Sequence, residues 1–169
     1  IRQGLDVAIS LGTTVVVLTT GGRSEEYMKN IYKSLPEYAF VQMGDFSGYT
    51  IKQCSKRNLK KIIIAGFIGK LTKMAMGIKQ THVRGSHISM DYLANIASLC
   101  VNSDNIINDI KKANTARHVS EIIIQNNIQN FFDLICKQVY IEMYNHSNKS
   151  MEIEVVMFSF EGKIIGKYA

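Results

Sequence analysis

The sequence predicts an α/β protein, because three short apolar runs rich in β-branched residues alternate with segments whose apolar residues recur at helical spacing. The runs are "TTVVVLT" at 13–19, "AFVQM" at 39–43 and "KIIIAG" at 61–66. Strands that alternate with helices in this order form a parallel sheet with helices on both faces. At 169 residues, 46% of them hydrophobic and 20% charged, the chain fits one soluble globular domain, residues 1–169.

Residues 1–85 are expected to form successive βα units. In order, the expected elements are a helix at 1–11, a strand at 13–19, a helix at 24–35, a strand at 39–43, a helix at 46–57 and a strand at 61–66. Ser24 is the expected N-cap of the second helix, with Glu25 and Glu26 in its first turn, and Pro36 is expected to end that helix. Asp45 is the expected N-cap of the third helix.

Residues 86–146 are expected to be mostly helical, and residues 150–167 to form a hairpin. The apolar spacing predicts helices at 89–101, 104–112, 115–126 and 128–145. The segments "MEIEVVMFSF" and "KIIG" read as two strands joined by a tight turn at Glu161-Gly162. The complete prediction is a Rossmann-like three-layer sandwich with a mostly parallel sheet and a C-terminal β-hairpin at the sheet edge.

Composition argues against several classes of protein. The longest apolar run, at 62–68, is far shorter than a membrane span, and residues 1–12 do not form a signal peptide. Cys54, Cys100 and Cys136 form no CxxC pair and are odd in number, which favours core positions and a reducing, cytoplasmic setting over a disulfide framework. The chain begins inside a predicted helix, which favours a piece of a longer protein. Whether the chain forms a homo-oligomer stays open.

The net charge of +6 is unevenly distributed. From Phe46 to Met90 there is no Asp or Glu. The basic residues of this stretch are Lys52, Lys56, Arg57, Lys60, Lys61, Lys70, Lys73, Lys79 and Arg84, with His82 and His87 besides. Either these residues form a solvated face or, after Gly66, they attract an anionic ligand at the mouth of the sheet. Aromatic residues are not interleaved with the basic ones, which argues against binding of single-stranded nucleic acid.

Three loops are expected at the carboxyl ends of the strands, where open parallel sheets bind ligands. They lie at 20–25, 44–45 and 66–70. Gly21-Gly22 would let a ligand approach the backbone at a helix N-terminus, and Asp45 follows the next strand, where adenosine-binding sheets place the carboxylate that holds the ribose. The alternative is a tight turn at Gly21-Gly22 and a helix cap at Asp45; the two features together favour an adenosyl ligand.

The stretch "KKIIIAGFIGKLTKMAMG" at 60–77 is not a Walker A phosphate loop, although a strand leads into Gly66 and Gly69-Lys70 follow. The position five before Gly69 is Ile64, and Leu71 stands where Ser or Thr would coordinate Mg²⁺. No resident metal is expected, because a metal site would need a third ligand and His82 and His87 belong to no recognised metal-binding spacing. These histidines belong either to a surface loop with Arg84 or to a contact with an anionic or metal-bearing substrate.

Four segments carry a resemblance to a known family. They are "TTGGRSE", "LPEYAFVQMGDFSGYTIKQC", "KKIIIAGFIGKLTKMAMGIKQTH" and "FSFEGKIIG". In order and spacing they resemble the cobalt-precorrin-5B C1-methyltransferase (CbiD) family of anaerobic cobalamin biosynthesis, across essentially the whole chain. The resemblance implies S-adenosylmethionine as cofactor and an anionic cobalt-tetrapyrrole as substrate. It also implies an N-terminal half of the same enzyme, with a Gly-Tyr-Thr-Thr-Gly-type motif, as partner.

The resemblance and the residue patterns together assign candidate site residues. The cofactor candidates are Thr20, Gly21, Gly22, Glu25, Gly44, Asp45 and Gly66. The substrate candidates are Gly69, Lys70, Lys73, Thr81 and His82. Methyl transfer from a sulfonium depends mainly on positioning, so no nucleophile–base triad is expected. Where deprotonation of the ring needs a base, the candidates are Asp45 and His82. Two alternatives stay open: a dinucleotide-binding oxidoreductase domain, although G-x-G-x-x-G is absent, and a basic non-catalytic nucleic-acid-binding module.

Overall fold

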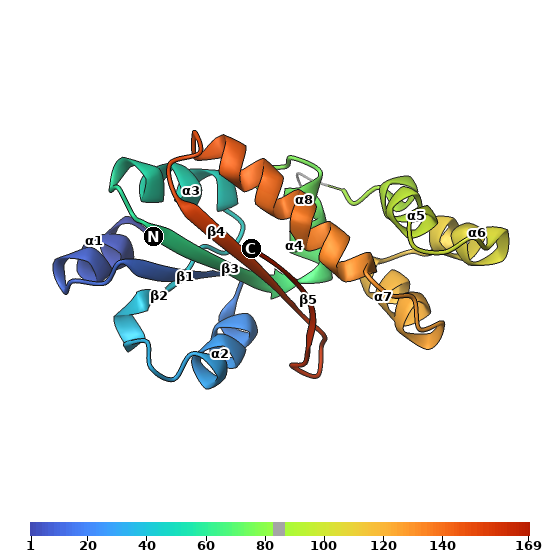
Figure 1. Ribbon diagram of the computed structural model, residues 1–169, viewed down its shortest axis with the longest axis horizontal. Helices are drawn as coiled ribbons and strands as arrows, with labels where there is room; N and C mark the ends of the chain where they lie inside the picture. Colours follow the sequence, from blue (N-terminus) through green and yellow to red (C-terminus); the bar gives the residue numbers. More distant parts are fainter. Residues whose placement is uncertain (83–86) are drawn as a thin grey trace.

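A computed structural model, which describes residues 1–82 and 87–169, contains a five-stranded sheet in the order β2-β1-β3-β4-β5 (Figure 1). The parallel strands are β1 (Val15–Thr19), β2 (Phe40–Gln42), β3 (Lys61–Phe67) and β4 (Glu152–Phe158). β5 (Ile164–Tyr168) pairs with β4 in the antiparallel direction and forms one edge. The predicted α/β fold with a mostly parallel sheet and a C-terminal hairpin is confirmed.

The helices follow the predicted order, with ends that differ by a few residues, apart from α4, for which the sequence predicted no bounds. They are α1 (Arg2–Ser10), α2 (Gly22–Ile31), α3 (Ser47–Lys56), α4 (Ile68–Ala75), α5 (Met90–Ser98), α6 (Asp104–Lys112), α7 (Ala116–Gln125) and α8 (Phe131–His146), and a short 3₁₀ helix spans Glu37–Ala39. Within the described residues, no helix is both long and apolar enough to cross a bilayer.

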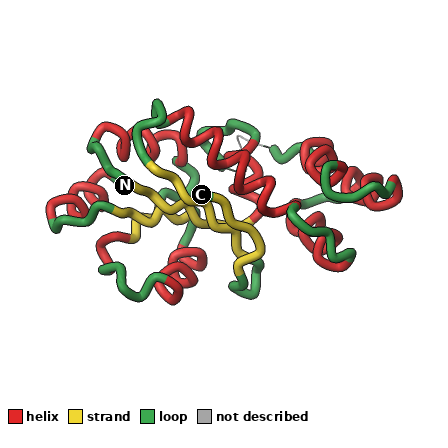
Figure 2. The backbone as a smooth tube through the Cα atoms, in the orientation of Figure 1, coloured by secondary structure: helices red, strands yellow, loops and turns green. Residues whose placement is uncertain are grey.

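The sheet has a large core on one face and a small core on the other. β3 contributes to both, with Ile62 and Ile64 in the large core and Ile63 and Ala65 in the small one. This explains its continuous apolar sequence, since a strand covered on both faces has no solvent side to make polar. Figure 2 shows the sheet between α2 on one side and the longer α8 on the other, and α5 and α6 lie beyond one end of the strands.

Two predicted N-caps are wrong. α2 begins at Gly22, so Ser24 lies inside its first turn, where its Oγ donates to the carbonyl of Gly21 at 2.8 Å. α3 begins at Ser47, with Phe46 at the N-cap position and no side-chain cap. Asp45 is not a cap because its carboxylate accepts bonds from residues distant in sequence, described below. Cys54 and Cys136 are buried as predicted, while Cys100 is half-buried.

Glu154 is a buried acid on the α2 side of the sheet. Two lysines form ion pairs with its carboxylate, and a tyrosine hydroxyl donates a hydrogen bond to it. Lys167 Nζ lies 2.8 Å from Oε1 and Lys61 Nζ lies 3.1 Å from Oε2. The hydroxyl of Tyr32 donates to Oε1 at 2.7 Å. Burial by itself would raise the pKa of Glu154, but the bonds from Lys167, Tyr32 and Lys61 lower it. Burial and the same hydrogen bond raise the pKa of Tyr32 to about 12.

The variant Glu154→Gln should therefore lower the free energy of unfolding at neutral pH by about 2 kcal/mol. A carboxyl whose pKa is lowered by folding stabilises the folded state above its unfolded pKa, and this contribution is lost as the pH falls through the folded value. Urea unfolding at neutral pH and in acid should thus show a weaker pH dependence for Glu154→Gln than for the wild type. Glu152→Gln, an exposed neighbour on β4, is the matched control. Equal losses in the two variants would contradict the prediction.

Candidate functional site at the carboxyl ends of the strands

The strand order defines a topological switch point, or crevice, at the carboxyl ends of β1 and β3. β1 pairs with β2 on one side and with β3 on the other, so the connections that follow β1 and β2 lead to opposite sides of β1. Such a switch point is where open α/β sheets bind ligands. Thr20 directly follows β1, and its side chain packs against Gly66 of β3. A Cβ at Gly66 would lie 2.5 Å from Thr20 Oγ1, so only glycine permits this approach.

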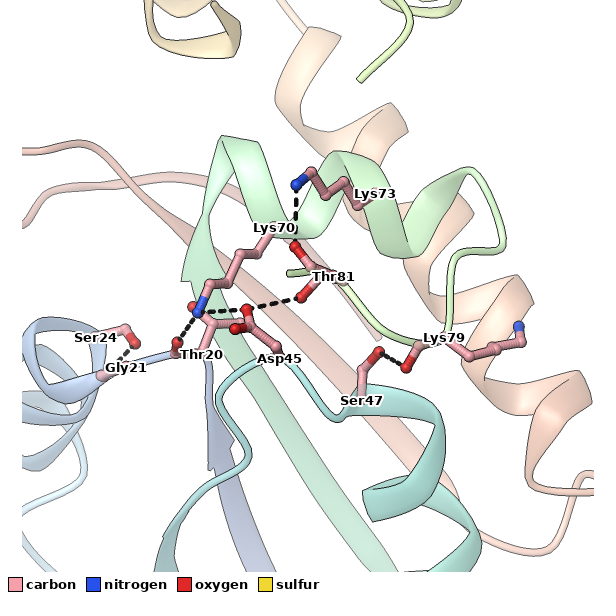
Figure 3. A network of polar contacts seen from close by, with 9 residues as sticks. All are labelled: Thr20, Gly21, Ser24, Asp45, Ser47, Lys70, Lys73, Lys79 and Thr81. Carbon is pink, nitrogen blue, oxygen red and sulfur yellow. Dashed lines mark hydrogen bonds and ion pairs between the residues drawn. The ribbon is translucent and has the colours of Figure 1, made fainter. Parts of the chain in front are cut away.

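Lys70 connects three of the loops at this edge (Figure 3). Its Nζ lies 3.1 Å from Asp45 Oδ1 and donates to the carbonyl of Thr20 at 2.7 Å. Thr81 Oγ1 donates to the same Asp45 oxygen at 3.3 Å. Burial would raise the pKa of Asp45, but the bond and charge of Lys70, with smaller effects of Thr81 and His82, hold it below its ordinary value. Asp45 is therefore an ionised acceptor at neutral pH rather than an acid.

Lys73 differs from Lys70 because it is buried without a carboxylate. The residue is 6% exposed, and its Nζ donates to the carbonyl of Thr81 at 3.0 Å. Among the described residues, no Asp or Glu lies within ion-pair distance of it. An ammonium has three donors, so Lys73 can donate two further hydrogen bonds beside the one to Thr81. This arrangement suits a site whose negative charge comes from a ligand.

A pocket of about 420 Å³ opens beside these lysines. It is lined by Ile68, Gly69, Lys70, Lys73, Thr81, His87, Ile88, Met90, Asn114, Thr115, Ala116, Arg117 and Phe160. None of these described lining residues is acidic. The pocket therefore combines an apolar wall with cationic groups from α4 and α7, a composition that suits an anionic ligand with a large apolar body.

The structure brings together most of the predicted substrate residues. Gly69, Lys70, Lys73 and Thr81 line the pocket. His82 is exposed, and it lies close enough to Asp45 for its charge to lower the pKa of that carboxyl. Arg84 lies outside the described residues.

The predicted cofactor residues divide into two groups. Thr20, Asp45 and Gly66 meet at the crevice, and Gly44 adopts a left-handed φ of 56° directly before Asp45. Gly21 lies at the N-terminus of α2 with no atom within 4 Å of the position that a Cβ would take. Its neighbourhood thus leaves room for a ligand at the first turn of the helix. Glu25 instead pairs with Lys29 at 2.8 Å.

Sequence reasoning did not find Arg117, Phe160 or Asn114, which come to the pocket from α7 and from the loops next to α7 and β4. No short motif marks them, because the pocket brings them together with α4 only through the folding of α8 and β4. His118 is exposed, and the ring of His146 lies 3.0 Å from the carbonyl of Gly48.

The acid-free stretch of sequence is not free of acids in space. Four of its cations pair with carboxylates from elsewhere in the chain. These pairs are Arg57 with Asp6, Lys61 with Glu154, Lys70 with Asp45, and Lys79 with Glu142. These four cations are therefore neutralised in space, and the cationic character that remains near the sheet mouth is concentrated at Lys73 and the pocket. Residues 1–82 and 87–169 hold no group of three or more His, Cys, Asp or Glu that could bind a metal ion.

The fold and this pocket define an open α/β domain with a cationic cavity at the carboxyl ends of its parallel strands. A family model described as "CbiD, C-terminal domain" matches residues 80–169, which is more than half of the chain. The chain belongs to the CbiD family.

The curated relatives agree with this assignment over a longer stretch. The chain is 35% identical over 167 residues to the cobalt-precorrin-5B C(1)-methyltransferase of Priestia megaterium, which covers 99% of this chain and 46% of that protein. It is 38% identical over 165 residues to the protein of the same name from Leptospira interrogans serovar copenhageni, covering 98% and 45%. The chain thus spans about half the length of the curated relatives it matches. No solved structure matches it significantly.

Proposed function

We propose that this chain forms the C-terminal part of a cobalt-precorrin-5B C1-methyltransferase, which uses S-adenosylmethionine to convert cobalt-precorrin-5B to cobalt-precorrin-6A in anaerobic cobalamin biosynthesis. The names of relatives that match 98–99% of the chain support this proposal. The structural observation that carries it is the buried ammonium of Lys73, which lines an acid-free pocket and has no carboxylate partner among the described residues. A cobalt-precorrin carries several acetate and propionate carboxylates that would supply the missing negative charge.

The residues of the crevice fit an adenosyl ligand. Among the described residues, Lys70 and Thr81 both bond Oδ1 of Asp45 and none bonds Oδ2, so Oδ2 would be the acceptor for ribose hydroxyls. The open space at Gly21 and the N–H groups of the first turn of α2 suit the carboxylate of the methionine part. S-adenosylmethionine supplies a sulfonium methyl group that a nucleophilic ring carbon attacks in line.

The protein's part in this reaction would be to orient the two ligands and to exclude water. The crevice of Thr20 and Asp45 adjoins the pocket through Lys70, which belongs to both. A ligand in each would therefore lie side by side across the Lys70 side chain. His82, which lies near Asp45, is the proposed base if a ring proton leaves.

Isothermal titration of S-adenosylhomocysteine tests the proposal, both with this chain and with the chain joined to its N-terminal half. We expect saturable heat of binding for the longer protein. The chain alone should show it as well if its crevice is sufficient to bind S-adenosylhomocysteine. NADH is the comparison ligand, because its own fluorescence would change on binding to an oxidoreductase domain. Absence of heat from both proteins with S-adenosylhomocysteine, or tighter binding of NADH, would overturn the proposal.

A further inference from the structure

A stack of two phenylalanine rings, with one arginine side chain at each end, borders the pocket. The rings of Phe67 and Phe160 lie parallel, with centroids 5.2 Å apart and an interplanar angle of 6°. The guanidinium of Arg117 lies 4.7 Å from the centroid of Phe160, and that of Arg23 lies 5.6 Å from the centroid of Phe67. Arg23 also donates from Nη2 to the carbonyl of Phe160 at 2.6 Å. The stack therefore joins α2, the end of β3, the loop after β4 and the first turn of α7.

Only one end of this stack reaches the pocket. Arg117 and Phe160 both line it, whereas Arg23 and Phe67 do not appear among its lining residues. Arg117 is bonded through Nε to Glu121 at 3.1 Å, one turn further along α7. A guanidinium has five N–H donors, and among the described residues the others of Arg117 have no protein acceptor. The ring of Phe160 and the carboxylate of Glu121 thus restrain the plane of a guanidinium whose remaining donors are available to a ligand.

We propose that Arg117 binds a peripheral carboxylate of the ligand in this pocket and that Phe160 is the positioning residue that holds its guanidinium. The inference rests on the proposed function, because it takes the ligand to be a cobalt-tetrapyrrole with carboxylate side chains. A guanidinium binds a carboxylate through two parallel hydrogen bonds, which fixes orientation as well as affinity. With Lys73 elsewhere in the same pocket, two cations would then hold two different carboxylates of one ring and so fix its rotation.

Spectrophotometric titration of the full-length protein with two cobalt corrins tests this inference. One corrin carries free acetate and propionate groups, as cobyrinic acid does, and the other has the same ring with these groups amidated. Arg117→Gln should weaken binding of the carboxylated corrin about tenfold or more, the effect of losing a charge-assisted partner, and leave the amidated corrin unaffected. Arg2→Gln, an exposed arginine outside this pocket, is the matched control.

The role of Phe160 is tested by a pair of variants. Phe160→Leu should weaken binding of the carboxylated corrin several-fold, on the order of one lost cation–π contact, and Phe160→Tyr should restore it because the ring is kept. The affinity for S-adenosylhomocysteine should stay unchanged in all three variants, which shows that they fold. Unchanged binding of the carboxylated corrin by Arg117→Gln, or an equal loss for both corrins, would overturn the inference. If the wild type binds neither corrin nor S-adenosylhomocysteine, it is the proposed function that fails.

Discussion

Lys73→Met should weaken binding of a carboxylated cobalt corrin about 100-fold, while the protein stays folded. The ammonium of Lys73 is buried and donates to the carbonyl of Thr81, and no described carboxylate neutralises it. Methionine has a similar length and flexibility, so it fills the same space without the charge. Removal of an uncompensated buried charge favours the folded state, and the lost bond to Thr81 opposes this gain, so the two effects on stability largely cancel.

Thermal unfolding and corrin titration of the same samples separate the two effects. We expect the free energy of unfolding of Lys73→Met to lie within about 1–2 kcal/mol of the wild type, the cost of one unmade hydrogen bond. Lys56→Met is the matched control, since Lys56 is an exposed lysine of the same acid-free stretch and has no ion pair among the described residues. If Lys73→Met and Lys56→Met bound the corrin equally well, the ammonium of Lys73 would have no role in the pocket.

The features that the sequence predicted well are those that depend on neighbours along the chain. The strands at 61–66 and 13–19 are recognisable because a parallel strand covered on both faces is apolar throughout. The helices after Gly85 are recognisable from apolar spacing, and Ser89 and Thr115 each accept a bond from a backbone N–H of the first turn. Such signals are local, and the structure preserves them.

The features that the sequence predicted poorly depend on distant partners. Asp45 was expected to cap a helix, as an Asp before a helix commonly does. Its carboxylate instead meets the ammonium of Lys70, and a charged hydrogen bond of this kind outweighs a cap. The same reasoning applies to Lys61, whose partner Glu154 lies on another strand. The spacing of apolar residues within one segment contains no information about which distant segment will pack against it.

The candidate site shows both cases. Lys70 and Lys73 follow a buried strand and a glycine turn, so their place at the mouth of the sheet could be predicted. The sequence could not predict that Lys70 is neutralised while Lys73 is not. The difference arises because Asp45 reaches Lys70 and does not reach Lys73. Phe160 enters the pocket because β4 pairs with β3 in parallel and carries the loop that follows it to the same edge, and Arg117 enters it because α7 packs beside α4.

Gly66→Ala should destabilise the fold by about 2 kcal/mol or more and disrupt the crevice as well, because the new methyl group has no space. A Cβ at Gly66 would lie 2.5 Å from Oγ1 and 2.8 Å from Cγ2 of Thr20, which is 5% exposed. Thr20 would have to move, and its carbonyl is the acceptor of the 2.7 Å bond from Lys70. The substitution should therefore lower both the free energy of unfolding and the affinity for S-adenosylhomocysteine.

A double-mutant cycle with Thr20→Ala identifies the contact that causes the loss. Thr20→Ala removes Oγ1 and Cγ2 and leaves only Cβ, which is 3.2 Å from the new methyl position, so the double variant should recover most of the stability that Gly66→Ala loses. Gly69→Ala is the control, because the nearest atom to its added Cβ is Ile88 Cδ1 at 4.0 Å and alanine favours the helix in which it lies. Urea unfolding of the four proteins of the cycle measures the coupling. If the two substitutions were simply additive, the close approach of β1 and β3 at Gly66 would not be what shapes the crevice.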